Sequence, residues 1–110
     1  MAYDDELVER IRHLTVDEPP LDEKRMFGGL GFMLDGNMAF AASSSGGLMV
    51  RIDRADSDRL CALPGAGPME MKGRTMNGWL HVEPEGLTDD DALADWIATG
   101  LDFARTLPPK

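Results

Sequence analysis

The sequence predicts an α+β domain: a two-layer α/β sandwich with an antiparallel sheet and the element order α-β-β-β-α-β-β-α. Three observations support this prediction. Apolar residues recur every three or four positions near both ends of the chain, as in amphipathic helices. They alternate at every second position over much of the middle, as in strands with one buried face. Short glycine-rich segments separate these strands at the spacing of hairpins, which makes the sheet antiparallel.

Two predicted helices open and close the chain. Residues 4–14 begin with acids, which the positive end of a helix dipole favours, and Pro19-Pro20 then forces an extended connection. Residues 88–91, Thr-Asp-Asp-Asp, are typical of a helix start, so we assign their acids to capping rather than to a cation site. The second helix is expected to end before Pro108-Pro109. The apolar stripes of the two helices are Leu7, Val8, Ile11 and Leu14, and then Leu93, Trp96, Ile97, Leu101 and Ala104.

Three consecutive strands are predicted after the first helix. Asp35-Gly36-Asn37 supplies the glycine and short polar side chains of a tight hairpin between the first two strands. Residues 43–47, Ser-Ser-Ser-Gly-Gly, form a flexible turn before the third. The apolar residues of the three strands are Leu30, Phe32 and Leu34, then Met38, Phe40 and Ala42 on one face, then Leu48, Val50 and Ile52.

A helix and a second hairpin are predicted in the remaining middle part. Asp53 can cap a helix from about Arg54 to Leu63, which Pro64-Gly65 ends. Residues 69–72 and 79–83 then form two strands around a glycine-containing turn.

Helices with one apolar stripe each must lie on the same face of the sheet, which leaves the other face open. The face against the helices is predicted to carry Leu30, Phe32, Leu34, Phe40, Leu48, Val50, Ile52, Leu80 and Val82. The open face is predicted to carry Met33, Ala39, Ala41, Met49, Arg51, Lys72, Trp79 and His81. Two methionines and a tryptophan are unusual on a solvated face and favour an interaction surface.

We therefore interpret the open face as a surface that binds a partner protein or a second copy of the chain. The expected partner-binding residues are Met33, Met49, Arg51, Lys72, Trp79 and His81. The alternative is that a loop or the N-terminal segment of the chain folds over this face.

Other conspicuous residues have simpler structural explanations. In Gly28-Gly29-Leu30-Gly31, Leu34 stands where a dinucleotide-binding loop needs its third glycine, so we expect a bulge or a close backbone approach. Cys61 lies among apolar residues and is expected to be a buried structural thiol. His13 and His81 lack the spacing of metal ligands. We expect no catalytic residue, metal or cofactor.

The composition is that of one folded domain, residues 1–110. Its 43% apolar and 28% charged residues are close to ordinary globular usage. The single cysteine favours a reducing compartment, the N-terminus begins with acids rather than a signal peptide, and no apolar run could span a membrane. We expect a cytoplasmic protein with no membrane contact.

The formal net charge of −9 argues against a general nucleic-acid surface, because lysine and arginine supply most of the non-specific affinity for phosphate. Only residues 24–82 carry more bases than acids, seven against five. We expect no direct binding of DNA by this chain alone.

Two motifs resemble the N-terminal domain of the TfoX/Sxy family. The first is residues 24–32, Lys-Arg-Met-Phe-Gly-Gly-Leu-Gly-Phe, ahead of the Asp35-Gly36 turn, and the second is residues 71–79, Met-Lys-Gly-Arg-Thr-Met-Asn-Gly-Trp. The resemblance covers nearly the whole chain. It implies a fold similar to the secretion-chaperone-like α/β sandwich, with the same element order that the periodicity predicts.

The resemblance also implies a regulatory role. Full-length members of the family are regulators of bacterial competence for DNA uptake, which act on transcription with a cyclic-AMP receptor protein and carry a further C-terminal domain. This chain ends at Lys110, so we expect the stand-alone domain. No known catalytic role attaches to the matching residues, which are Arg25, Met26, Phe27, Gly28, Gly29, Met76, Gly78 and Trp79.

The leading hypothesis is thus a non-enzymatic binding or regulatory domain that acts through protein contacts. The alternative is a domain that binds a small anionic ligand through Lys24, Arg25, Lys72 and Arg74. An enzyme is the third hypothesis, for which the sequence offers no paired acid and base.

Overall fold

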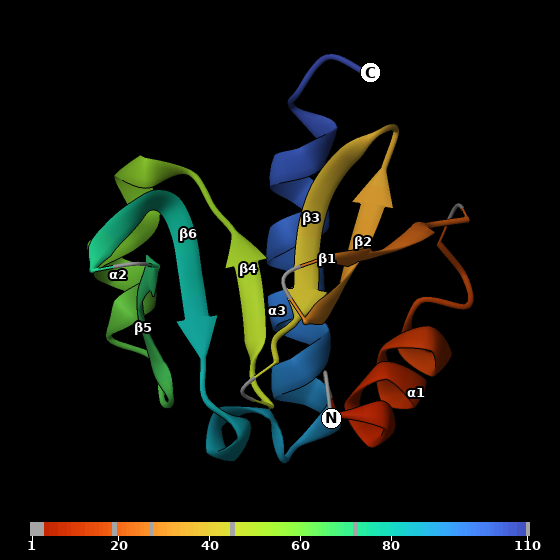
Figure 1. Ribbon diagram of the computed structural model, residues 1–110, viewed down its shortest axis with the longest axis horizontal. Coiled ribbons are helices and arrows are strands. Elements are labelled where there is room, and N and C mark those ends of the chain that lie inside the picture. Colours follow the sequence, from red (N-terminus) through yellow and green to blue (C-terminus); the bar gives the residue numbers. More distant parts are fainter. Residues whose placement is uncertain (1–3, 19, 27, 45, 72, 110) are drawn as a thin grey trace.

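An antiparallel sheet forms one layer of the molecule, and α3 lies behind β3 and β4 in the second layer (Figure 1). The computed structural model describes residues 4–18, 20–26, 28–44, 46–71 and 73–109. Within these ranges six strands pair in the order β1-β2-β3-β4-β6-β5, each antiparallel to its neighbours. The predicted α+β sandwich is therefore confirmed.

The elements follow the predicted order, with one strand added before the first hairpin. Their bounds are α1 Asp5–Leu14, β1 Asp22–Met26, β2 Gly29–Leu34, β3 Asn37–Ala42, β4 Leu48–Arg51, α2 Ser57–Cys61, β5 Ala66–Met71, β6 Arg74–Val82 and α3 Asp90–Arg105, with 3₁₀ turns η1 Arg54–Asp56 and η2 Pro84–Leu87. The added strand, β1, reads Asp-Glu-Lys-Arg-Met and shows no apolar alternation. It lies at the edge of the sheet, where charged side chains can remain in solvent.

The middle of the chain differs from the prediction in its element lengths. The helix expected from Arg54 to Leu63 is a 3₁₀ turn followed by a helix that ends at Cys61. Asp53 caps this turn as expected, since its Oδ1 accepts a hydrogen bond from the Ala55 N–H at 3.0 Å. Strands β5 and β6 extend beyond the predicted ranges because their pairing reaches Ala66 at one end and Arg74 at the other, and so satisfies further backbone groups.

Both long helices begin on an aspartate cap. In α1 the Oδ1 of Asp4 accepts hydrogen bonds from the N–H groups of Glu6 and Leu7, at 3.0 and 3.3 Å. In α3 the Oδ1 of Asp89 accepts one from the Asp91 N–H at 3.2 Å. These bonds satisfy N–H groups that have no partner inside the helix. The assignment of the acids at 89–91 to a helix start is thereby confirmed.

An ion-pair cluster joins α1 to the edge strand β1. Arg12 contacts Glu23 at 2.7 Å and Glu9 at 2.6 Å. The hydrogen bonds from Arg12 hold the pKa of the Glu23 carboxyl below its usual range. Both side chains remain partly in solvent, so this pair contributes little to stability and serves mainly to fix α1 relative to β1.

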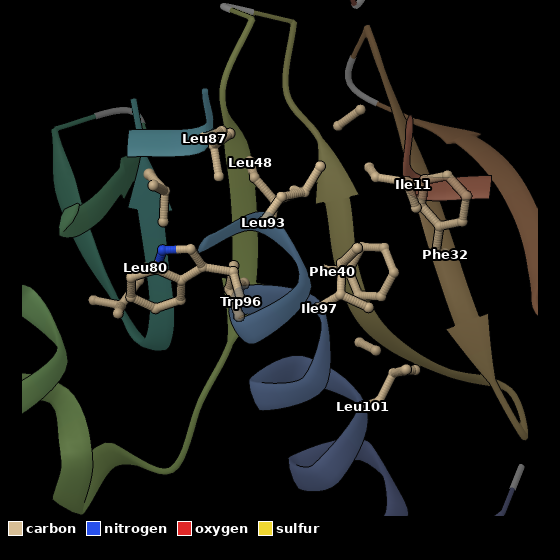
Figure 2. Close-up of a cluster of buried hydrophobic side chains, with 14 of the residues drawn as sticks. Ile11, Phe32, Phe40, Leu48, Leu80, Leu87, Leu93, Trp96, Ile97 and Leu101 are labelled. Carbon is tan, nitrogen blue, oxygen red and sulfur yellow. The ribbon is translucent and has the colours of Figure 1, made fainter. Parts of the chain in front are cut away.

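The core lies between the sheet and the two long helices (Figure 2). All nine strand residues predicted to face the helices are buried. The rings of Phe32 and Phe40 stack across β2 and β3 with centroids 5.0 Å apart. From the helix side come Leu7, Val8, Ile11, Leu93, Trp96, Ile97 and Leu101, all buried. Cys61 is partly buried and packs against this core.

A β-bulge in β3 corrects the predicted faces of that strand. The register moves from Phe32 opposite Phe40 to Met33 opposite Met38, so Ala39 is an extra residue. Ala39 belongs to the core, not to the open face. Met38 lies on the open face, not on the same face as Phe40, because one extra residue reverses the face of the side chains beyond the bulge.

Helix α3 approaches this bulge closely at Gly100. A Cβ added to Gly100 would lie 2.4 Å from the carbonyl oxygen of Ala39, a distance that real Cβ atoms do not adopt. Both Gly100 and Ala39 are fully buried or nearly so. The helix can therefore lie this close to the backbone of β3 only because residue 100 has no side chain.

The glycines at positions 28, 29 and 31 allow β2 and β3 to approach each other closely, as the sequence predicts. Gly28 has a φ of +76°, and a Cβ on Gly29 would lie 2.4 Å from the Ala42 carbonyl oxygen. A Cβ on Gly31 would lie 2.9 Å from Cε of Met38, which is the far end of a flexible side chain. Gly29 thus permits a backbone contact, whereas Gly31 makes room for Met38.

We expect Gly29→Ala to lower the free energy of unfolding by on the order of 1 to 3 kcal/mol, since the new methyl meets backbone that cannot move aside. Gly67→Ala is the matched control, because Gly67 also lies in a strand and a Cβ there has no atom within 4 Å. Urea unfolding followed by circular dichroism measures both. Equal midpoints for the two variants would contradict the close approach of β2 to β3.

Candidate functional site

The candidate site is the open face of the sheet, opposite α1 and α3. The register aligns one residue from each of five strands across this face, in the row Gly31, Ala41, Met49, His81 and Gly67. Three members of this row are glycine or alanine. Small residues in a row that also holds large ones leave a hollow in the surface.

This hollow is a groove that we call the methionine groove. It has a volume of about 220 Å³ and is lined by Gly29, Met38, Ala41, Ala42, Ser43, Ser44, Met49, Met69, Met76 and Trp79. Four of the eight methionines of the chain line it. The surface is consequently apolar, polarizable and made largely of side chains that change rotamer easily.

Irregularities in two strands bring three of these methionines to the groove. The β3 bulge moves Met38 to the open face. Between β5 and β6 the register changes from Pro68 opposite Leu80 to Glu70 opposite Thr75, so β6 carries extra residues where Met76 lies. Met69 lies at the same break on β5. Only Met49 reaches the groove by simple alternation.

Trp79 forms one wall of the methionine groove and is partly exposed in the part of the chain that the structure describes. The guanidinium carbon of Arg51 lies 5.7 Å from the centroid of the Trp79 ring. The same carbon lies 5.7 Å from the Phe103 ring on α3. Arg51 therefore connects the wall of the groove to the helix layer through two cation–π contacts, which restrict the Trp79 ring.

A second depression adjoins the groove at Trp79, and we call it the arginine cleft. It has a volume of about 340 Å³ and is lined by Arg54, Ala55, Ser57, Pro68, Thr75, Met76, Gly78 and Trp79. Met76 and Trp79 line both depressions. The apolar groove thus continues into a cleft that carries a cation and two hydroxyl groups.

His81 lies beside the groove in a more enclosed place. Its side chain is 14% exposed, and its Nδ1 lies 3.4 Å from Oε1 of Glu83. With Ser43, Ser44, Pro68, Met69 and Glu70 it lines an open depression that shares Ser43, Ser44 and Met69 with the methionine groove. A Cβ on Gly47 would lie 3.0 Å from Nε2 of His81, so this glycine leaves space for the ring.

The structure brings together part of the predicted partner-binding set. Met49 and Trp79 line the methionine groove, Arg51 supports Trp79, and His81 lies in the next depression. Met33 lies on the same face but does not line the groove. Lys72 falls outside the described residues. The prediction missed Met38, Met69 and Met76, whose positions depend on the two strand irregularities.

The four residues of the anionic-ligand alternative do not form one cluster among the described residues. Lys24 and Arg25 lie on β1 at one edge of the sheet, whereas Arg74 begins β6 on the far side of β2, β3 and β4. Neighbouring strands are about 4.8 Å apart, so β1 and β6 are separated by roughly 19 Å along a flat sheet. Lys24 and Arg25 are also consecutive in a strand, so their side chains point to opposite faces.

Metal-binding groups and membrane-spanning helices are both absent from the part of the chain that the structure describes. No group of three or more histidine, cysteine, aspartate or glutamate side chains there could hold a metal ion. None of the helices in those ranges is long and apolar enough to cross a membrane.

Comparison with known proteins gives one family. The family model described as the TfoX N-terminal domain matches residues 14–104, which is most of the chain. No match to a curated protein or to a solved structure reaches significance. The matched range includes every residue that lines the methionine groove and the arginine cleft.

Proposed function

The chain belongs to the TfoX N-terminal domain family, and we propose that it is a regulatory domain that works by binding a partner protein in the methionine groove. The observation that carries the proposal is the groove itself. Methionine and tryptophan are enriched at protein interfaces, and methionine side chains adapt to partners of different shape. The resemblance to this family implies a regulatory role rather than a catalytic one, which agrees with the proposal.

The size of the groove favours a protein segment over a cofactor. Ligand and cofactor sites usually measure about 300 to 1,000 Å³. At about 220 Å³ the methionine groove alone is smaller than this range. It suits one or two apolar side chains of a partner. A few such anchor residues commonly carry most of the affinity of a protein interface.

The chemistry of the lining supports binding rather than catalysis. The methionine groove presents thioethers, methyl groups, an indole and two serine hydroxyls. A proton-transfer mechanism needs a base within hydrogen-bond reach of the reacting group. The ring of His81 lines the neighbouring depression and faces Glu83, so a ligand in the methionine groove would meet mainly apolar atoms. We propose a non-enzymatic role on this basis.

Trp79 is the expected anchor residue. Removing a large apolar side chain from water contributes roughly 1.5 to 3 kcal/mol, which corresponds to a factor of about 10 to 150 in affinity. The contacts of Arg51 with Trp79 and Phe103 hold the ring in place before a partner arrives. Such preorganisation reduces the entropy lost on binding.

We expect Trp79→Ala and Met49→Asp to lose the partner that wild-type chain retains in affinity purification from the native cell. The first removes the anchor, and the second places a charge among the methionines, where it would be desolvated. Val16→Asp is the matched control, because Val16 is an exposed apolar residue just after α1 and does not line the groove. Quantitative mass spectrometry of the purified material measures the loss, and circular dichroism confirms folding.

The partner in this experiment can also be a second copy of the chain. Light scattering then reports a dimer of the wild-type chain and of Val16→Asp, and a monomer of the two groove variants. The proposal fails if both folded groove variants keep the wild-type oligomeric state and every wild-type partner.

Direct binding of DNA is not part of the proposed function, and we expect duplex DNA to show no retardation by this chain at physiological ionic strength. The net charge of −9 repels phosphate. Electrophoretic mobility measured at several salt concentrations tests this. Tight, salt-sensitive retardation would show a phosphate-binding surface that the groove does not provide.

A further inference from the structure

The arginines of the chain divide into two groups by their ion pairs. Those on the helices contact carboxylates: Arg10 with Asp90, Arg12 with Glu9 and Glu23, Arg59 with Asp56, and Arg105 with Asp102 and Glu18. Within the described ranges, Arg25, Arg51, Arg54 and Arg74 contact none. Acids outnumber bases by 20 to 11 in this chain, so unmatched cations are unexpected in it.

Two of these four arginines, Arg51 and Arg54, lie at one end of the methionine groove. Arg51 stacks on Trp79 and Arg54 lines the arginine cleft, whereas Arg25 lies on the distant edge strand and Arg74 does not line the cleft. Arg54 is exposed. The methionine groove therefore ends at two arginines that contact no described carboxylate, and we call this its basic end.

No described carboxylate contacts Arg51 or Arg54 at this end. The Oδ1 of Asp53 accepts a hydrogen bond from the Ala55 N–H at 3.0 Å, and Asp56 pairs with Arg59 at 3.4 Å. Glu70 lies opposite Thr75 in the sheet and is exposed without contacting a described arginine. A carboxylate from outside the molecule is thus the complementary charge for Arg54.

We infer that the partner segment is both apolar and acidic, with an apolar side chain that fills the methionine groove and a carboxylate beside it that enters the arginine cleft and pairs with Arg54. This inference rests on the proposed function and specifies the partner's chemistry. Ser57 and Thr75 offer hydroxyl groups to the same carboxylate. Trp79 and Met76 line both depressions, so one short segment can occupy both.

Other partner chemistries fit this arrangement less well. A basic segment would face Arg54 at the basic end of the groove, and like charges across an interface reduce affinity. A single-stranded nucleic acid could stack on Trp79, but its phosphates would meet a molecule of net charge −9. Charge complementarity at the basic end therefore selects an acidic peptide.

The first test selects short random peptides displayed on phage against the wild-type chain, with counter-selection against Trp79→Ala. Enriched peptides are expected to combine a leucine, methionine or aromatic residue with a nearby aspartate or glutamate. Enriched peptides that depend on Trp79 but carry lysine or arginine instead of acids would overturn the inference and leave the proposed function standing. A selection that yields no peptide dependent on Trp79 would overturn both.

The second test measures the affinity of a selected acidic peptide by fluorescence anisotropy. Arg54→Glu should weaken binding at least about tenfold at low salt, and the difference should shrink as salt rises. Arg25→Glu is the matched control, since it makes the same charge change at an exposed arginine on the distant edge strand. Equal affinities for the two variants, or displacement of the peptide by oligothymidine, would contradict the acidic-peptide assignment.

Discussion

The contact between Gly100 of α3 and the bulge at Ala39 of β3 determines how the two faces of the sheet differ. The helix lies so close to β3 that a Cβ on Gly100 would be 2.4 Å from the Ala39 carbonyl oxygen. The extra residue in β3 turns Ala39 into the core beneath the helix and turns Met38 outward. One local irregularity thus completes the core on one face and supplies a side chain to the methionine groove on the other.

Because helices cover only one face of the sheet, the other face is available for the partner binding that we propose. Helices bury the apolar side chains of one face, and the other is left with side chains that are neither fully buried nor fully solvated. Methionine, alanine and a tryptophan held by Arg51 make that face apolar without making it rigid. The arginines of α1 and α3 pair with carboxylates, whereas Arg51 and Arg54 near Trp79 contact none among the described residues.

The sequence was sufficient to predict the layers and the central residues of the site, because they follow from regular periodicity. Alternation placed Leu48, Val50 and Ile52 in the core, and therefore Met49 on the open face. It could not place Met38, Met69 and Met76, since a bulge changes the face of a side chain without leaving a signature in the apolar pattern. Gly78, with φ of +87° in the middle of β6, was the one visible sign of the second irregularity.

The methionine groove is the proposed contact surface for the partner, and methyl NMR of methionine tests that claim most directly. Protein labelled with ¹³C at the methionine methyl groups is titrated with the partner recovered by the wild-type chain. The signals of Met38, Met49, Met69 and Met76 should shift together, and that of Met33, which pairs with Met38 but does not line the groove, should shift less. Shifts centred on Met33, or none at the four groove methionines while the partner binds, would show that the contact surface lies elsewhere.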